Sequence, residues 1–344
     1  MPEVEKVAHR SADRPRVAAT PGGMAWSWRL FGLGVVFAVP AAVVALWQPG
    51  FGLAVAVGTV PAAINRLAPL RSARVSVVVV GVGAGLSLVA GALLTQVPAV
   101  AVAVLFLLGP AAALGARTGR LGAMALALGL PLVGIGLSIS DVATALALGG
   151  VMAVASVYAW LVSLLWPAED PEPESAPAPP PLGRRAALAY GILLGTAGAL
   201  AAGIGYALGL EHVGWATGAC LLVMRPHRSL LFSRSIGRAL SVLVGALAAA
   251  LFALAAPQPW AIAAACMLVL AAATATQRSR WYVAPGFTTF LALSMIMHQP
   301  GQSPAVSFQE RVGETLLGVA LALLFGWGLP AALTRLVRRS PARL

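Results

Sequence analysis

Residues 215–248 read WATGACLLVMRPHRSLLFSRSIGRALSVLVGALA: a short apolar segment, a gap that holds four arginines, and a long apolar segment. The same alternation extends from this stretch in both directions. All but one of the 23 Lys and Arg residues fall at every second gap between apolar segments. Short cytoplasmic loops collect basic residues, whereas translocated loops exclude them. The pattern therefore predicts a polytopic membrane protein with both termini and the centre of the chain in the cytoplasm.

The composition agrees with a bilayer as the solvent, because 59% of the residues are apolar and only 10% are charged. The formal net charge of +12 sits in the gaps beside the apolar segments and lacks interleaved aromatic residues. We therefore expect anionic lipid as a partner and no nucleic acid. Cys220 and Cys266 both lie inside apolar segments, where they predict neither a metal site nor a disulfide.

Seven basic clusters predict twelve crossings of the membrane, each near the ~20 residues that span the hydrocarbon layer. The predicted spans are 29–47, 51–64, 75–96, 98–116, 121–138, 142–166, 186–208, 212–224, 235–256, 259–276, 283–298 and 310–333. The second and the eighth spans are short, so these helices must tilt, break or stop partway.

The two halves of the chain are similar to one another. A shift of 154 residues places Arg71 on Arg225 and Arg74 on Arg228, and it also aligns a small-residue helix. Each half has an even number of spans, so both copies insert in the same orientation. The predicted fold is an all-α polytopic membrane protein of about twelve transmembrane helices, arranged as two parallel six-helix repeats.

This pattern divides the chain into five regions. They are a cytoplasmic N-terminal segment at 1–28, a first six-span unit at 29–166, an acidic Pro-rich cytoplasmic linker at 167–185, a second six-span unit at 186–334 and a basic cytoplasmic tail at 335–344.

Four arginines crowd the gap between the eighth and the ninth span and are candidate ligands of an anion that arrives from the cytoplasm. They are Arg225, Arg228, Arg234 and Arg238. Arg238 lies about one turn inside the predicted span, where an unpaired charge is costly. The alternative interpretation is that these side chains only anchor the topology. Trp215 in the short eighth span is a further candidate, because an aromatic substrate could stack on it; interfacial anchoring is the alternative.

The outer side of the predicted bundle carries most of the acidic candidates. Arg311 is the only basic residue there, and it shares a helical face with Glu314. This pair either binds a substrate carboxylate or forms a structural ion pair. Glu314, Asp141 and Glu211 are candidate proton-coupling groups, because a carboxyl at the membrane boundary can take up and release a proton. For Asp141 and Glu211 the alternative is a solvated helix start.

The sequence lacks the motifs of several enzyme classes. It contains no nucleotide-binding loop, no nucleophile elbow and no His cluster with metal-ligand spacing. We therefore predict that the chain is not an enzyme and needs no cofactor.

Two motifs resemble the fusaric acid resistance family, whose members are also described as aromatic acid exporters. Residues 215–248 match its core in a Trp, an Arg-Pro pair, spaced arginines and a small-residue helix. Residues 310–318, ERVGETLLG, resemble its second signature, an Arg followed by an acid-Thr pair and a Gly. In the first half only Arg71, Arg74 and the small-residue helix correspond. The Arg-Pro pair and a counterpart of Arg238 are missing there.

The resemblance implies a transporter of the bacterial inner membrane that exports aromatic or other organic anions. A more distant likeness to plant malate channels implies an anion pathway. The resemblance to the fusaric acid resistance family also implies a periplasmic adaptor as a partner, as in some of its members. A homodimer is compatible with the sequence. We expect export coupled to the proton-motive force. A passive anion channel and a non-transporting scaffold for envelope proteins are the alternatives.

Overall fold

The computed structural model describes residues 24–168, 182–225, 228–279 and 282–332. Every regular element in these ranges is helical. The predicted basic tail and most of the predicted linker and N-terminal segment lie outside the described residues.

The helices follow the predicted spans closely. In the first half they are α2 Trp28–Trp47, α3 Pro49–Ile64, α4 Ser76–Thr95, α5 Pro98–Gly115, α6 Arg120–Met124, η3 Ala125–Gly129, α7 Leu130–Gly136 and α8 Val142–Leu165, with a short η2 Arg71–Val75 before α4. In the second half they are α9 Arg184–Ala207, α10 Val213–Val223, α11 Arg228–Leu254, α12 Pro259–Ala275, α13 Ala284–Met297, α14 Pro304–Leu323 and η4 Leu324–Gly328.

Within the described ranges, seven helical stretches are long and apolar enough to cross a membrane, and five apolar helices are shorter. The continuous helix formed by α6, η3 and α7 is one of the short five. The structure therefore has the helix content of a membrane protein, with α3 and α10 short, as the sequence predicted.

Proline sets the start of several of these helices. Pro49, Pro98, Pro259 and Pro304 each occupy the first turn, where the missing N–H costs nothing and the fixed φ suits a helix. Pro304 begins α14 six residues earlier than the predicted span. The α11 helix likewise begins seven residues early. Both helices therefore contain polar residues that hydropathy alone assigns to loops.

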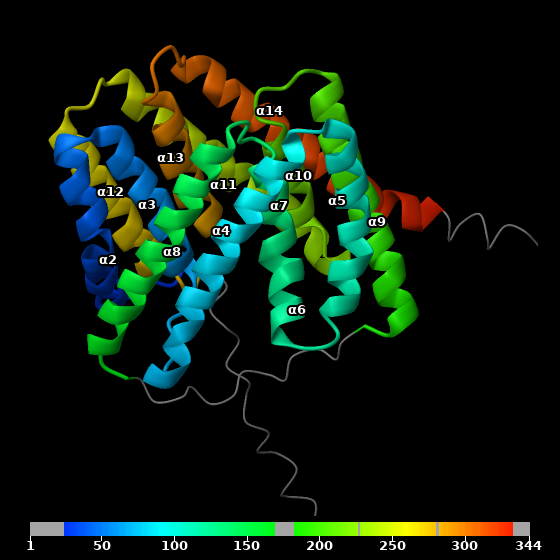
Figure 1. Ribbon diagram of the computed structural model, residues 1–344, viewed down its shortest axis with the longest axis horizontal. Helices are drawn as coiled ribbons and strands as arrows, with labels where there is room; N and C mark the ends of the chain where they lie inside the picture. Colours follow the sequence, from blue (N-terminus) through cyan, green and yellow to red (C-terminus); the bar gives the residue numbers. More distant parts are fainter. Residues whose placement is uncertain (1–23, 169–181, 226–227, 280–281, 333–344) are drawn as a thin grey trace, which may run out of the picture.

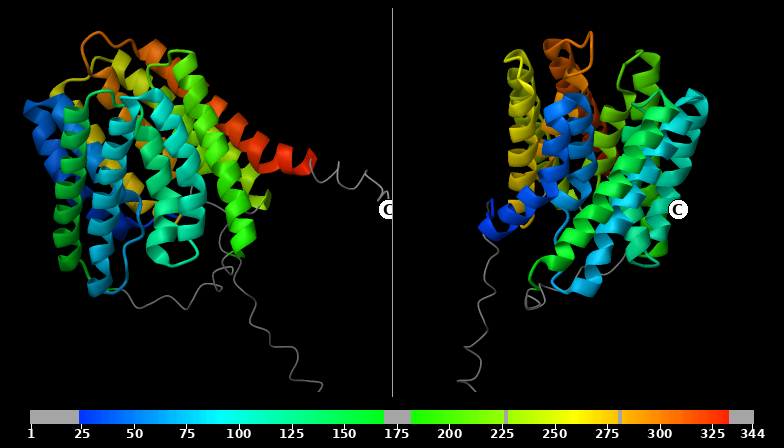
Figure 2. Two further views of the ribbon diagram at one scale, coloured as in Figure 1. Left: turned by 45° about the vertical axis from the view of Figure 1, so that its right-hand side comes forward. Right: turned by 60° about the vertical axis from the view of Figure 1, so that its left-hand side comes forward.

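Helices from the two halves of the chain interleave. The α2 helix packs along α12, and α5 packs along α9. These two pairs lie at opposite sides of the molecule in Figure 1. Glycine permits both contacts, since Gly34 lies against the backbone of Ala271 and Gly109 against that of Gly191 and Gly195. In the left view of Figure 2, α14 crosses the bundle at a slant, whereas α4 and α8 stand upright.

The remaining pairings have the same pattern in each half. The α3 helix contacts α8 as α10 contacts α14, and α4 contacts α7 and α8 as α11 contacts α13 and α14. Across the halves, α7 packs on α10 and α13 packs on α3.

Arg74 is the largest fully buried side chain of the described residues. Its guanidinium donates hydrogen bonds to five backbone carbonyls: those of Ala68, Pro69, Ser163, Trp166 and Pro167. The residue therefore ties the segment before α4 to the end of α8. The sequence aligned Arg74 with a candidate anion ligand, but its donors are occupied by the backbone.

Candidate functional site

The short helix α10 lies in the middle of the second half and is buried along nearly its whole length. It packs against α14, α9 and α7. Close contact with α14 depends on Gly318, because a methyl group added there would overlap the carbonyl oxygen of Ala216. Side chains of the neighbouring helices that face α10 are consequently held between helices rather than at a surface.

Arg311 of α14 is one of these groups. Only 8% of its surface is exposed, and its guanidinium carbon lies 4.7 Å from the centre of the Trp215 ring. A cation over an aromatic face is attracted by the ring quadrupole. Nη2 of Arg311 also lies 3.4 Å from Oγ1 of Thr289 on α13. Arg311 thus joins three helices, α10, α13 and α14, at one point.

Arg238 lies well inside a helix. The α11 helix begins at Arg228, so at 1.5 Å per residue Arg238 is about 15 Å from its start. The side chain is 5% exposed and close enough to Arg311 for the two charges to interact. Among the described residues, no carboxylate oxygen lies within ion-pair distance of either guanidinium.

Glu314 lies one turn along α14 from Arg311 and is 4% exposed. The charges of the two residues interact, but they do not form the ion pair that the sequence offered as one alternative. Within the part of the chain that the structure describes, neither carboxyl oxygen of Glu314 makes a hydrogen bond of normal geometry. The site therefore contains a buried carboxyl beside Arg311, and the charge of Arg311 also interacts with Arg238.

His212 and two glutamates lie at the outer end of this site. The His212 ring stacks on Trp215, with the ring centres 4.0 Å apart and the planes 10° from parallel. Its Nδ1 atom lies 3.4 Å from Oε2 of Glu310. Burial lowers the pKa of His212, while Glu211 and Glu310 act in the opposite direction. Glu211 itself is exposed, and Nε2 of Gln302 lies 3.4 Å from its carboxylate.

Sequence reasoning did not select His212 as a site residue. The available signal was its position beside Glu211 and three residues before Trp215, which is the spacing of neighbours on one helical face.

At the other end of α10, Arg225 and Arg234 lie near Tyr190 of α9. Nη1 of Arg225 lies 3.2 Å from the carbonyl oxygen of Met224, which also accepts a hydrogen bond from the Tyr190 hydroxyl. The charges of Arg225 and Arg234 interact. Arg228 begins α11, but its side chain lies outside the described residues. Arg225 and Arg234 therefore form an inner group, apart from the more deeply buried Arg238.

Asp141 occupies a different environment. It is the N-cap of α8, and its carboxylate accepts hydrogen bonds from the backbone N–H groups of Ala143 and Thr144 and from the Thr144 hydroxyl, the last at 2.6 Å. These bonds, led by that from the hydroxyl, lower the pKa of Asp141. This exposed carboxylate has the geometry of a helix cap.

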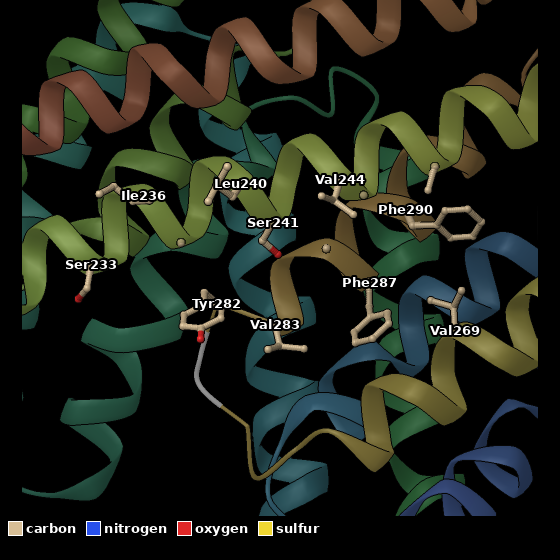
Figure 3. Close-up of a pocket in the computed structure, with 14 residues that line it drawn as sticks. Ser233, Ile236, Leu240, Ser241, Val244, Val269, Tyr282, Val283, Phe287 and Phe290 are labelled. Carbon is tan, nitrogen blue, oxygen red and sulfur yellow. The ribbon is translucent and has the colours of Figure 1, made fainter. Parts of the chain in front are cut away.

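A groove of about 780 Å³ lies between α11, α12 and α13 (Figure 3). Phe287 and Val283 of the α13 side and Leu240 and Val244 of α11 give it an apolar lining. None of the candidate arginines lines this groove. It is therefore distinct from the charged site around Trp215.

Residues 200–325 match a family model described as fusaric acid resistance protein-like. These residues form a fusaric acid resistance protein-like region. The resemblance predicted from the sequence is confirmed over this stretch, which contains Trp215, Arg238, Arg311 and Glu314. No curated protein and no solved structure matches the chain. The charged site thus lies wholly inside the fusaric acid resistance protein-like region of a membrane protein.

Proposed function

We propose that this protein exports organic anions across the bacterial inner membrane and that the proton-motive force drives export. The observation that supports the proposal is the pair of buried arginines, Arg238 and Arg311, without a carboxylate at ion-pair distance among the described residues. Charged side chains within membrane segments are costly and face the bundle interior, where they mark ion or substrate pathways.

The charge balance of the site favours an anionic substrate. Arg238 and Arg311 are both buried, whereas Glu314 is the only buried carboxyl among the described residues; the two glutamates at the outer end are more exposed. The buried part of the site therefore holds more cationic than acidic groups. A substrate carboxylate can accept bidentate hydrogen bonds from a guanidinium. The Nε atoms of Arg238 and Arg311 have no hydrogen-bond partner among the described residues and are available as donors. Trp215 contributes by holding the Arg311 guanidinium over its ring.

The route starts at the inner group of arginines. Arg225, Arg228 and Arg234 attract the anion from the cytoplasm, and Arg238 with Arg311 binds it within the bundle. Glu314 is the coupling group in this proposal, because it is a buried carboxyl whose oxygens make no hydrogen bond of normal geometry among the described residues. Glu211 and Asp141 are exposed, and Asp141 caps its helix, so they are less suited to that role.

We further propose that the two halves are degenerate repeats with one surviving site. The corresponding helix contacts in the two halves support a duplication. The shift of 154 residues places Arg238 on Ala84, which lies in an apolar cluster with Leu88 and Met152. The first half would then be a scaffold without an anion site.

The proposal includes cytoplasmic termini and twelve crossings. Anionic lipid is the expected partner of the basic loops, and a homodimer and a periplasmic adaptor are compatible with it.

Counterflow in proteoliposomes with labelled aromatic and dicarboxylic acids tests the proposal. We expect saturable flux for the native protein, loss of most of it in Arg238→Gln, and native flux in Arg120→Ala, a control at an exposed arginine. Detergent-solubilised variants must elute as folded protein.

Two results would replace the proposal. A voltage-dependent current that ignores a pH gradient would indicate a passive channel. An absence of flux for every acid tested, with folded protein, would favour the scaffold.

A further inference from the structure

Three potential metal ligands meet at the outer end of the site although they are far apart in the sequence. Glu211 and His212 precede α10, and Glu310 belongs to α14. Their ligand atoms all lie within 4.8 Å of one another. The sequence predicted no metal site, because these residues lack the short spacing by which metal motifs are recognised.

The separation of the two better-fixed ligands suits direct coordination. Nδ1 of His212 and Oε2 of Glu310 are 3.4 Å apart. Zinc bonds to His nitrogen and carboxylate oxygen are about 2.0–2.2 Å long, which places tetrahedral ligands about 3.4 Å from each other. Glu211 is exposed, so rotation of its side chain can close the remaining distance.

His212 is a preorganised ligand: it is buried, and its ring orientation is fixed. The residue is 8% exposed, and stacking on Trp215 fixes the plane of its ring. Its Nδ1 atom is buried, makes no hydrogen bond of normal geometry among the described residues, and points to Glu310. An imidazole nitrogen that faces two carboxylates, without another partner, is a donor set of borderline divalent metals.

We propose that Glu211, His212 and Glu310 bind a divalent transition-metal ion of the zinc class, with an open position for water. One imidazole and two carboxylates compensate both charges of the ion. Oxygen-preferring ions such as magnesium fit less well, because they favour octahedral sites built from oxygen. The binding site stands on these residues alone and is independent of the transport proposal.

Metal binding has a structural consequence for the neighbouring site. The three ligands connect the segment before α10 to α14, the helices that carry Trp215 and Arg311. A bound ion would tie these helices together at the outer end. If the protein is a transporter, as proposed above, the ion would hold the outer end in one conformation and slow transport.

The binding test uses the full-length protein in detergent, with any affinity tag removed and metal stripped by a chelator. Zinc alone is titrated against a competing fluorescent chelator and by calorimetry. We expect one zinc ion per chain at micromolar concentration. His212→Gln and Glu310→Gln should each weaken binding at least tenfold, as expected of direct ligands. Glu211→Gln should have a smaller effect because its side chain is exposed.

His298→Gln is the matched control, because His298 is an exposed histidine near the outer end of α13. This variant should keep native affinity and stoichiometry. Native affinity in both His212→Gln and Glu310→Gln, or no saturable binding up to millimolar zinc, would overturn the proposal. Magnesium at the same concentrations should not compete.

Flux measurements separate the metal site from the proposed function. Zinc should slow counterflow in the native protein and in His298→Gln but not in Glu310→Gln. Binding without any measurable flux would leave the metal site standing and refute the transport proposal. Measurable flux without zinc binding would refute the metal site and leave the transport proposal standing.

Discussion

Replacement of Arg74 by Met should destabilise the protein by about 3–6 kcal/mol without changing its affinity for substrate. Arg74 is fully buried, and its guanidinium is the donor to five backbone carbonyls that belong to two separate segments. A hydrogen bond to a charged group contributes about 1.5–3 kcal/mol. Even if water replaced the guanidinium at three of the carbonyls, the loss of two bonds would give the stated range. Met retains much of the side-chain volume, so a large cavity should not add to the cost.

The assay compares thermal unfolding midpoints of native protein, Arg74→Met and Arg71→Met in the same detergent and at the same scan rate. Arg71 lies three residues earlier and is exposed, so its variant should unfold within error of native. At about 2 °C per kcal/mol for a large domain, Arg74→Met should unfold roughly 6–12 °C lower.

Two outcomes would refute this reasoning. An Arg74→Met protein as stable as Arg71→Met would show that the carbonyls do not depend on the guanidinium. A raised KM for the anion, at unchanged stability, would mean that Arg74 is a ligand like its sequence counterparts in the second half.

Three further predictions address the coupling group, the α10–α14 contact and the α8 cap. Glu314→Gln should abolish accumulation of anion against its gradient under an imposed pH difference, while downhill counterflow persists; retained uphill transport would exclude Glu314 as the coupling group. Gly318→Ala should lower the unfolding midpoint and flux because its methyl group meets the backbone of Ala216. Gly313→Ala on the same helix meets nothing and should be neutral or more stable by about 0.5–1 kcal/mol. Asp141→Ala should lower the unfolding midpoint at pH 7, and the difference should shrink as the pH falls below the ordinary carboxyl pKa of about 4: the native pKa is lowered, so the cap contributes fully above that value and is lost as the pH falls through the native pKa.

Most of the helix pattern could be predicted because each apolar segment is bounded by basic residues or proline. The starts of α11 and α14 were predicted six or seven residues too late. Hydropathy treats Arg234 or Gln309 as loop residues, but Arg and Gln have good helix propensity. Tertiary packing then determines where these helices begin, because α11 and α14 lie against one another and against α10 and α13.

The site could be predicted only in part, for a related reason. Trp215, Arg238, Arg311 and Glu314 were selected as unusual residues in apolar surroundings, which is information that a sequence contains. The separation of Arg225 and Arg234 from the more deeply buried Arg238 depends instead on how α11 packs against the neighbouring helices. The role of Arg74 and the meeting of His212 with Glu310 depend on contacts between distant segments, for which the sequence has no local signal.

The packing between the two halves suggests how a site confined to the second half can act on the whole bundle. The α10 helix bears Trp215, and it packs on α7 of the first half as well as on α14. Gly134 and Ile135 of α7 approach Gly214 and Gly218 of α10 so closely that a methyl group added to either α10 glycine would overlap α7. Packed interfaces without free space respond by moving as units rather than by bending. Movement of α10 around a bound anion would therefore carry α7 with it, so a first half without a counterpart of Arg238 would still take part in opening the pathway.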